Sequence, residues 1–297
     1  EMVNSADQGG VVLHHAIQSS MAGNGVSVLV IPGDVTMQEA DDDSFVESKI
    51  STGRPVVFPD PAEAAALTQA INEAKSVTLF VGAGVKDARE QVLKLAEKIK
   101  APIGHALGGK MYIQYENPFD VGMNGLLGYG AAHEATHEAD LLILLGTDFP
   151  YNDFLPDANV AQVDINGSHI GRRTKISYPV TGDVAATIEN ILPHVDEKKD
   201  RSFLDKMLKK HYGKLEHVVE AYTSNVDKHT PIHPEYVADL IDKNADEDAI
   251  FTVDTGMCNV WGARYITANG KREQIGSFRH GTMANALPQA LGAQAAN

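Results

Sequence analysis

The sequence has little of several residue types, and each shortage excludes a class of protein. Cys258 is the one cysteine among 297 residues, so no internal disulfide can form and a cytoplasmic setting is expected. Basic residues number 25 against 40 acidic ones, giving a net charge of −15. This balance argues against nucleic acid as a partner, because phosphate binding needs a concentrated basic surface. No apolar run approaches the roughly 20 residues of a membrane-spanning helix, and no signal peptide is visible.

Residues 140–171 carry the clearest signal for a fold. Two short apolar runs, Leu141–Leu145 and Val160–Ile165, end in Gly146-Thr147-Asp148 and Asp164-Ile165-Asn166. Short apolar runs followed by turn residues are typical of buried parallel strands. In open α/β sheets ligands lie beyond the carboxyl ends of such strands, where an Asp can accept hydrogen bonds from ribose hydroxyls. The pattern predicts a nucleotide-binding α/β domain, although an ordinary sheet with polar loops would give the same signal.

Strands and helices alternate along most of the chain. Strands are predicted at Val26–Ile31, Ser76–Val81, Pro102–Ala106, Leu141–Leu145, Val160–Ile165, Tyr178–Val180 and Ala249–Val253. Helices are predicted at 8–24, from Pro61, at Ala88–Ile99, near 131–139, after Asp183, over 200–226 and from His233 to about Asn244, with two more towards the C-terminus. A βαβ series of this kind predicts a parallel sheet. Residues 122–130 are expected to form a glycine-rich loop.

Residues 35–54 are interpreted as a linker. They contain Asp41-Asp42-Asp43, which could bind a cation, although a solvated acidic loop is the more ordinary interpretation. Glu1 is not a start residue, and Ala295-Ala296-Asn297 falls inside an expected helix. We therefore expect the chain to be part of a longer protein.

Two glycine-rich motifs are partial matches to phosphate-binding sites. Gly82-Ala83-Gly84 follows a predicted strand, but Asp87 stands where the dinucleotide fingerprint has its third glycine. Residues 104–110 match the P-loop spacing through Lys110, but Met111 replaces the Ser or Thr that would hold magnesium. An ATPase is therefore rejected, and Lys110 either meets a phosphate or points to water.

His133-Glu134-Ala135-Thr136-His137 has the H-E-x-x-H pattern of zinc hydrolases, in which both histidines share one helix face. No glutamate between Glu138 and Glu189 offers a third ligand at short spacing, and the extended His-x-x-Gly-x-x-His pattern is absent. A chance match on a surface helix is the preferred interpretation. Cys258 begins a predicted helix, where a thiolate would be stabilised, but no histidine partner can be assigned and a structural role is preferred.

The end of the chain is more specific. GSFRHGTMANALPQALGAQ, residues 276–294, resembles the thiamine-diphosphate domain of the pyruvate oxidase and acetolactate synthase superfamily. AIFTVDTGMCNVWGARYI, residues 249–266, resembles the strand–helix unit before it. The middle is similar through KIKAPIGHALGGK, NPFDVGMNGLLG, LLGTDFPY and QVDINGSHIG. Within the superfamily, these motifs look most similar to bacterial quinone-dependent pyruvate dehydrogenases, also called pyruvate oxidases.

The resemblance implies an α/β protein with a central parallel-sheet FAD domain, Rossmann-like and of the DHS-like type, flanked by parts of two thiamine-diphosphate-binding α/β domains. The implied boundaries are a tail of the pyrimidine-binding domain at 1–34, a linker at 35–54, the FAD domain at 55–195, a helical connector at 196–232 and the start of the pyrophosphate-binding domain at 233–297.

The resemblance also assigns residues to cofactors. FAD contacts are implied for Gly82, Ala83, Gly84, Leu107, Lys110, Met123, Asn124, Gly125, Leu126, Gly146, Thr147, Asp148, Phe149, Pro150, Asp164, Ile165, Asn166, Gly182 and Asp183. Thiamine diphosphate contacts are implied for Gly256, Met257, Gly281, Thr282 and Met283. Asp164 would hold a ribose hydroxyl, the Gly281 carbonyl would accept from the aminopyrimidine, and Met283 would support the bent cofactor. Some relatives carry an arginine where Leu126 aligns.

The implied activity is oxidative decarboxylation of pyruvate to acetate and CO2, with electrons passed through FAD to a quinone. The family's activating glutamate and its Mg2+ ligands would lie outside the chain, so no catalytic residue and no metal ligand is expected here, and the chain by itself should be inactive. A homo-oligomer, dimer or tetramer, is expected, with a cytoplasmic location that could be peripheral at the inner face of the membrane. Three alternatives stay open: an acetolactate synthase-like carboligase with structural FAD, a non-catalytic nucleotide-binding module, and the zinc hydrolase.

Overall fold

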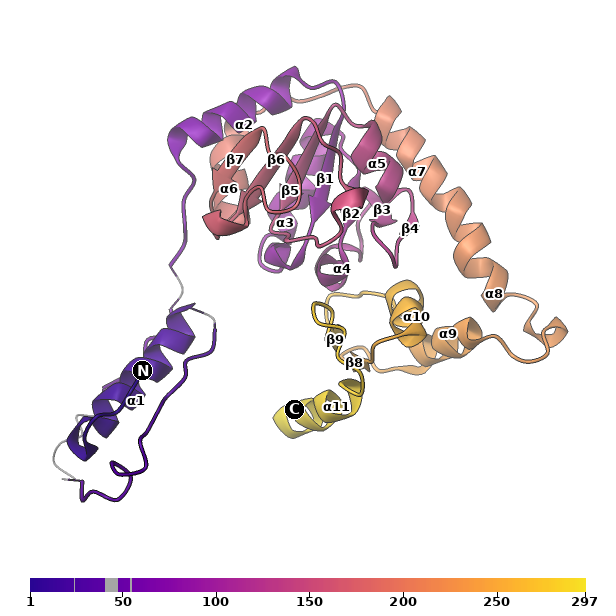
Figure 1. Ribbon diagram of the computed structural model, residues 1–297. Coiled ribbons are helices and arrows are strands. Elements are labelled where there is room, and N and C mark those ends of the chain that lie inside the picture. The colour runs from indigo at the N-terminus through magenta and orange to yellow at the C-terminus, as the bar shows by residue number, and fades with distance from the viewer. Residues whose placement is uncertain (24, 41–47, 54) are drawn as a thin grey trace. The chain divides into compact units, whose positions relative to one another are not determined.

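The computed structural model describes residues 1–23, 25–40, 48–53 and 55–297. They form two compact units, Glu1–Val56 and Val57–Asn297 (Figure 1). The Asp41-Asp42-Asp43 triplet, considered above as a cation site, lies outside the described residues.

The Glu1–Val56 unit contains the predicted N-terminal helix, α1 (Gly9–Gly23), after a short 3-10 turn, η1 (Ala6–Gln8). The predicted strand Val26–Ile31 is wrong, because only Val30 forms an isolated parallel bridge, to Met2. A strand needs a hydrogen-bonded neighbour along its length, and here the contacts with the N-terminal residues are Val3 N to Val30 O at 2.9 Å, Val30 N to Glu1 O at 2.8 Å and the Glu1 amino group to Val28 O at 2.8 Å. The apolar run is correspondingly exposed, with Val26 at 94%.

The Val57–Asn297 unit is built on a seven-stranded sheet in the order β4-β3-β2-β1-β5-β6-β7. The strands are Val77–Val81 (β1), Ile103–His105 (β2), Asp120–Met123 (β3), Tyr129–Gly130 (β4), Leu141–Leu145 (β5), Val160–Asp164 (β6) and Tyr178–Thr181 (β7). All neighbours pair in parallel except β3 with β4. The predicted α/β class and the parallel sheet are confirmed.

Both faces of the central strands are buried, which explains why β5 is apolar at every position. Alternate residues such as Leu79 and Ile143 join one core with α2 (Pro61–Glu73), α3 (Arg89–Ile99) and α6 (Val184–Ile191). Phe80, Leu142 and Leu144 face the other side, against Phe149 and Leu155. Figure 1 shows α2 and α6 beside β7, and α5 (Ala132–Glu138) beside β2 and β3.

Two expectations for the segment between β2 and β5 need correction. Residues 122–130, predicted as a glycine-rich loop, include parts of both strands of the β3–β4 hairpin, in which Gly122 pairs with Gly130. Leu107-Gly108-Gly109-Lys110, the end of the segment considered above as a partial P-loop match, is not a loop but the first turn of α4 (Leu107–Ile113). Glycines hid both elements, since they lower helix and strand propensity and mask the apolar period.

The predicted helix over 200–226 consists of α7 (Ser202–Leu215), a π-helical turn at Glu216–Glu220 and α8 (Ala221–Thr223). A second sheet follows, made of two parallel strands, β8 (Ile250–Val253) and β9 (Glu273–Gly276). Around it lie α9 (Pro234–Asn244), α10 (Met257–Tyr265) and α11 (Ala286–Ala296). The helix and strand expected from His233 to Val253 are confirmed. Within the described ranges, no helix is long and apolar enough to cross a membrane.

Helix α2 begins with a capping interaction that can be tested. The Asp60 carboxylate accepts hydrogen bonds from Ala62 N at 2.8 Å and Glu63 N at 3.3 Å, and Pro61 follows at the first helical position. We predict that Asp60→Ala lowers the free energy of unfolding by about 1 kcal/mol, because two amide groups lose their acceptor. Asp60→Asn should retain most of the stability, since Asn caps about as well. Equal denaturation midpoints for Asp60→Ala and the wild type would contradict the role of the cap.

Candidate functional site

The strand order of the central sheet indicates where a ligand-binding crevice lies. Numbered along the chain, its parallel strands have the spatial order 3-2-1-4-5-6, which is that of dinucleotide-binding folds. The order reverses between β1 and β5, and ligands of such sheets lie at this point, beyond the carboxyl ends of the strands. Because the strands are parallel, the predicted FAD residues that follow strand ends come to this same edge of the sheet. Their contacts with FAD stay predictions.

The loops after β1 and β5 fit tightly against each other. A Cβ atom at Gly82 would lie 2.6 Å from both Gly146 O and Thr147 Cβ, and one at Gly84 would lie 2.6 Å from Gly146 Cα. Gly84 N also donates to Gly146 O at 2.9 Å. These glycines are therefore needed for the contact between the loops. Ala83 and Gly84 are nevertheless exposed, which leaves the tip of the turn open to a ligand.

The loop Asn124–Gly128 follows β3 at the same edge. Asn124 is buried, with its Nδ2 donating to Phe154 O at 2.9 Å and its Oδ1 accepting from Gly125 N at 2.8 Å. Gly128 N donates to Gly125 O at 2.8 Å and closes a turn. Leu126 stands at the tip, 66% exposed. The loop thus exposes an apolar side chain, while hydrogen bonds of Asn124 and Gly128 hold its backbone. Met123, which precedes the loop, is buried.

Two acidic residues, Asp148 after β5 and Asp164 at the end of β6, form hydrogen bonds within the fold. Asp148 Oδ1 accepts from Arg173 Nε at 2.9 Å, and its Oδ2 accepts from Arg172 Nη1 at 3.2 Å. Partial burial acts to raise the pKa of Asp148, but the hydrogen bonds and charges of these arginines lower it below its usual range. Asp164 is buried, and its Oδ1 accepts from Asn166 N at 2.9 Å. Its role at a ribose hydroxyl stays a prediction.

The remaining predicted FAD residues differ in how accessible they are. Pro150, Ile165 and Asn166 are exposed at the strand ends, and Leu107 is half-buried. Thr147 and Phe149 are buried. Gly182 is buried beside Thr187, and Asp183 caps α6 by accepting from Ala186 N at 3.0 Å. The edge is therefore lined by exposed backbone and apolar groups, with Asp183 engaged in capping α6 and the Thr187 hydroxyl buried without a partner among the described residues, which fits a dinucleotide in outline.

Lys110 does not lie where the sequence suggested. Its side chain is 1% exposed, and its Nζ donates to Ile266 O and, at 3.5 Å, to Gly262 O. Burial lowers the pKa of Lys110 to about 8, while Asp242 and Asp120 act to raise it. The expectation that Lys110 points to water or stands free to meet a phosphate is therefore corrected. Its ammonium group holds the end of α10.

Asp120 and His105 lie near Lys110 in the same buried region. Burial raises the pKa of Asp120 to about 7, partly offset by a hydrogen bond from Gly122 N and by the charge of Lys110. His105 Nε2 lies 3.6 Å from Asp120 Oδ1. Burial lowers the pKa of His105 to about 3, so the imidazole is neutral and this contact is not an ion pair.

A second site lies at the carboxyl ends of β8 and β9. Thr255 Oγ1 donates to Thr282 O at 3.0 Å, and Ser277 Oγ lies 3.0 Å from Thr282 Oγ1. Asn285 Nδ2 donates to Asp254 Oδ1 at 3.2 Å, and Asn285 Oδ1 accepts from Ser277 N at 3.1 Å. We name these five residues the hydroxyl clasp. They hold the loop after β8 against the loop that carries Gly281, Thr282 and Met283.

The clasp brings the predicted thiamine diphosphate residues together. Gly256 precedes α10 with a φ of 124°, and a Cβ there would have no neighbour within 4 Å, so open space adjoins the helix start. No side chain caps this end of the helix, whose first amide groups have no partner within the helix. Such an end attracts a phosphate group. Met257 and Met283 are 58% and 79% exposed, which leaves both free to contact a ligand.

The side chains of the H-E-x-x-H segment and of Cys258 have partners within the fold. The Glu134 carboxylate forms an ion pair with Lys214, and His137 Nδ1 lies 2.9 Å from His133 O. Among the described residues no group of three His, Cys, Asp or Glu side chains is placed to hold a metal ion. Cys258 Sγ donates to Asp254 O at 3.1 Å.

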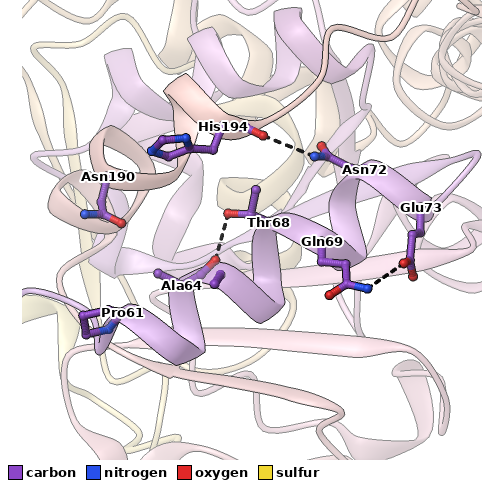
Figure 2. Close-up of a pocket in the computed structure, with 9 residues that line it drawn as sticks. Pro61, Ala64, Thr68, Gln69, Asn72, Glu73, Asn190 and His194 are labelled. Carbon is purple, nitrogen blue, oxygen red and sulfur yellow. Dashed lines mark hydrogen bonds between the residues drawn. The ribbon is translucent and has the colours of Figure 1, made fainter.

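A groove with a volume of about 560 Å³ lies between α2 and the end of α6, and Figure 2 shows the residues that line it. Several of its polar side chains have partners within the fold: Gln69 donates to the Glu73 carboxylate at 2.8 Å, and Asn72 donates to the backbone carbonyl of His194 at 3.2 Å. No predicted cofactor residue lines it. We assign it no function.

Together these features define a class: a doubly wound α/β domain followed by a βαβ unit whose strand-end loops form a cofactor-type site. The central-domain model of the thiamine pyrophosphate enzymes matches residues 64–191, and the C-terminal TPP binding domain model of the same enzymes matches residues 254–297. The two models cover more than half of the chain. The chain belongs to the thiamine pyrophosphate enzyme family, whose members are enzymes.

Individual relatives support the same family. The chain is 31% identical over 294 residues to YdaP of Bacillus subtilis, named as a thiamine pyrophosphate-containing protein, and this covers 98% of the chain and 50% of YdaP. It is 29% identical over 317 residues to an acetolactate synthase of Mycobacterium bovis, covering 99% and 49%. It is 43% identical over 215 residues to an uncharacterized 42.6 kDa protein of Pseudomonas amyloderamosa, covering 72% and 54%. The chain spans about half the length of these relatives.

The structure adds residues that the sequence did not single out. Ser277 and Asn285 of the hydroxyl clasp lie within the segment 276–294 that resembles the family, but they were given no role, although Asp254-Thr255 directly after a strand was a usable signal. Arg172 and Arg173 approach Asp148 from the segment after β6, and two consecutive arginines in an acidic chain could have drawn attention. Arg264 had no local signal, because its contacts are distant in sequence.

The packed glycine turn yields a test with an internal control. We predict that Gly84→Ala lowers the free energy of unfolding by about 1–3 kcal/mol, because the new methyl group overlaps Gly146. Gly213→Ala should instead raise it by about 0.5–1 kcal/mol, since Gly213 is exposed on α7 with nothing near its Cβ position. Urea unfolding of both variants checks the pair. Equal effects of the two substitutions would show that the loops after β1 and β5 are not tightly packed.

Asp120 gives a prediction on pH. A carboxyl whose pKa is 3.8 unfolded and about 7 folded loses stability as pH rises through that window, because the folded state binds the proton more tightly. Asp120→Asn cannot ionise, so its stability relative to the wild type should rise between about pH 4 and pH 7, by up to about 4 kcal/mol, and then level off.

Chemical denaturation at several pH values measures this difference. The control is Asp205→Asn, at an exposed position on α7, which should change stability by no more than about 0.5 kcal/mol at any pH. If the difference in unfolding free energy between Asp120→Asn and the wild type did not change with pH, the raised pKa of Asp120 would be contradicted.

Proposed function

We propose that the full-length protein decarboxylates pyruvate with thiamine diphosphate and passes two electrons through FAD to a quinone, giving acetate and CO2. The observation that carries the thiamine diphosphate part is the hydroxyl clasp, which sets an open helix start beside Gly281 and Met283. The quinone-linked outcome rests on the sequence resemblance described first.

Residues of this chain would hold the cofactor in defined ways. The first amide groups of α10 bind the diphosphate, with Gly256 leaving room for it. The Gly281 carbonyl accepts from the aminopyrimidine, and the exposed Met283 side chain supports the bend. Thiamine diphosphate, when bound, supplies the carbanion that adds to a 2-keto acid and the electron sink for loss of CO2. Mg2+ is proposed with ligands outside the chain.

The crevice between β1 and β5 is the proposed FAD site. Its exposed turn at Ala83 and Gly84 and the apolar Leu126 suit a dinucleotide with a flat ring system. The overall reaction then balances: pyruvate and water give acetate, CO2, two protons and two electrons, which a quinone accepts. We further propose a homo-oligomer, to which the exposed Leu287 and Leu291 of α11 offer an apolar surface, and a cytoplasmic location, peripheral at the membrane where the quinone lies.

The second candidate is carboligation with structural FAD. Acetolactate synthases of several organisms are similar to nearly the whole chain, which favours this reading. Two pyruvate molecules and a proton would then give acetolactate and CO2, and the flavin would not change its redox state. A nucleotide-binding module without catalysis is the third candidate.

Anaerobic addition of pyruvate to the full-length protein with thiamine diphosphate, Mg2+ and FAD separates the candidates. We expect the visible flavin band to bleach as CO2 is released. An unchanged band with acetolactate formed would establish the carboligase, and FAD binding without CO2 release would leave only the nucleotide-binding module.

A matched pair of variants ties the result to the site. Gly256→Ala should reduce thiamine diphosphate affinity and CO2 release roughly tenfold or more, because alanine resists the φ of 124° at the helix start. Gly292→Ala on α11, with nothing near its Cβ position, should behave as the wild type. Full activity of Gly256→Ala would contradict the placement of the diphosphate.

A further inference from the structure

Helix α10 connects the two proposed cofactor sites. Its first turn, after Gly256, lies at the thiamine diphosphate site, and its last turn lies against the central domain. The helix has nine residues, about 13 Å in length. One short, stiff element thus reaches from one site to the edge of the other.

Arg264, in the last turn of α10, contacts the loop Asn124–Gly128. Its Nη2 donates to Gly128 O at 3.1 Å, and its Nε donates to Leu127 O at 3.4 Å. The planar guanidinium can serve two neighbouring carbonyls at once, because its donors are fixed in a fork. These two carbonyls belong to the two residues that follow the exposed Leu126 in the loop.

Contacts of the neighbouring residues in the last turn of α10 fix the position of Arg264. Ala263 is fully buried in a cluster with Met123 and Tyr129, so the helix cannot slide on the central domain without opening a core. Lys110 donates to Ile266 O and Gly262 O, the carbonyls at the end of α10. A cation at this end also interacts favourably with the helix dipole.

We infer that Arg264 is a positioning residue that fixes the loop Asn124–Gly128, so that the thiamine diphosphate domain holds one wall of the FAD crevice in place. Arg264 is assigned no contact with FAD and acts through the carbonyls of Leu127 and Gly128. The inference rests on the FAD site proposed above. Its consequence is that FAD affinity depends on a side chain outside the central domain.

The test compares Arg264→Gln with Arg264→Lys in the chain, with Arg201→Gln as the matched control. Arg201 is exposed on the surface and pairs with Asp205, which lies on α7. The first measurement is amide hydrogen exchange. Arg264→Gln should speed exchange across residues 124–129, while β1 and β5 keep wild-type rates. Unchanged exchange across 124–129 would overturn the inference, whether or not FAD binds.

The second measurement is FAD affinity, from titration of flavin fluorescence, together with the visible circular dichroism of bound flavin. Arg264→Gln should weaken binding roughly 5-fold or more and change the dichroism, with the melting temperature close to that of Arg201→Gln. Arg264→Lys should recover part of the affinity, because an ammonium can still donate to one carbonyl. Wild-type affinity and dichroism in Arg264→Gln would overturn the inference.

The two proposals fail in different ways. If the wild-type chain and the full-length protein bind no FAD, the proposed flavin function fails, and hydrogen exchange still decides whether Arg264 fixes the loop. If FAD binds equally well to all variants, the FAD site stands and the role of Arg264 is rejected.

Discussion

The parallel pairing of β1 with β5 is the constraint on which the rest of the structure depends. Five consecutive residue pairs, from Val77 with Leu141 to Val81 with Leu145, lie in register and are buried on both faces. This pairing joins segments on either side of the β2–β4 region and creates the reversal of strand order. It also forces the turns after the two strands together, which is why glycines occupy both. The crevice exists because of this pairing, and the side chains around the crevice determine which ligand it can bind.

The pattern of apolar runs was enough to predict the class, the parallel sheet and the position of most strands, because strands buried on both faces must be apolar throughout. It failed where local signals depend on partners. Val26–Ile31 reads as a strand, yet a strand forms only if a neighbour supplies hydrogen bonds. The β3–β4 hairpin was hidden by glycines that serve its tight packing. The local pattern of residues determines the propensity to form a strand, whereas strand pairing depends on segments that are distant in the sequence.

The same contrast between local patterns and distant partners explains which residues of the candidate site could be predicted. Residues in the turns after strands, such as Gly256 and Gly146, could be found from the sequence because topology alone places strand ends together. Lys110 was misplaced, because a lysine in a glycine-rich turn gives no sign that carbonyls 152 and 156 residues further on will bind it. Ser277 and Asn285 were missed for a similar reason: a hydroxyl or an amide becomes part of a clasp only through partners brought in by another loop.

One consequence concerns how the helix between the two sites can be observed. Trp261 is the single tryptophan of the chain, and it lies in the middle of α10. Its Nε1 is buried without a hydrogen-bond partner among the described residues. Indole emission responds to polarity and to nearby water, so the intrinsic fluorescence of this chain is a built-in optical reporter of α10. Movement of that helix can be followed in real time without attaching a dye.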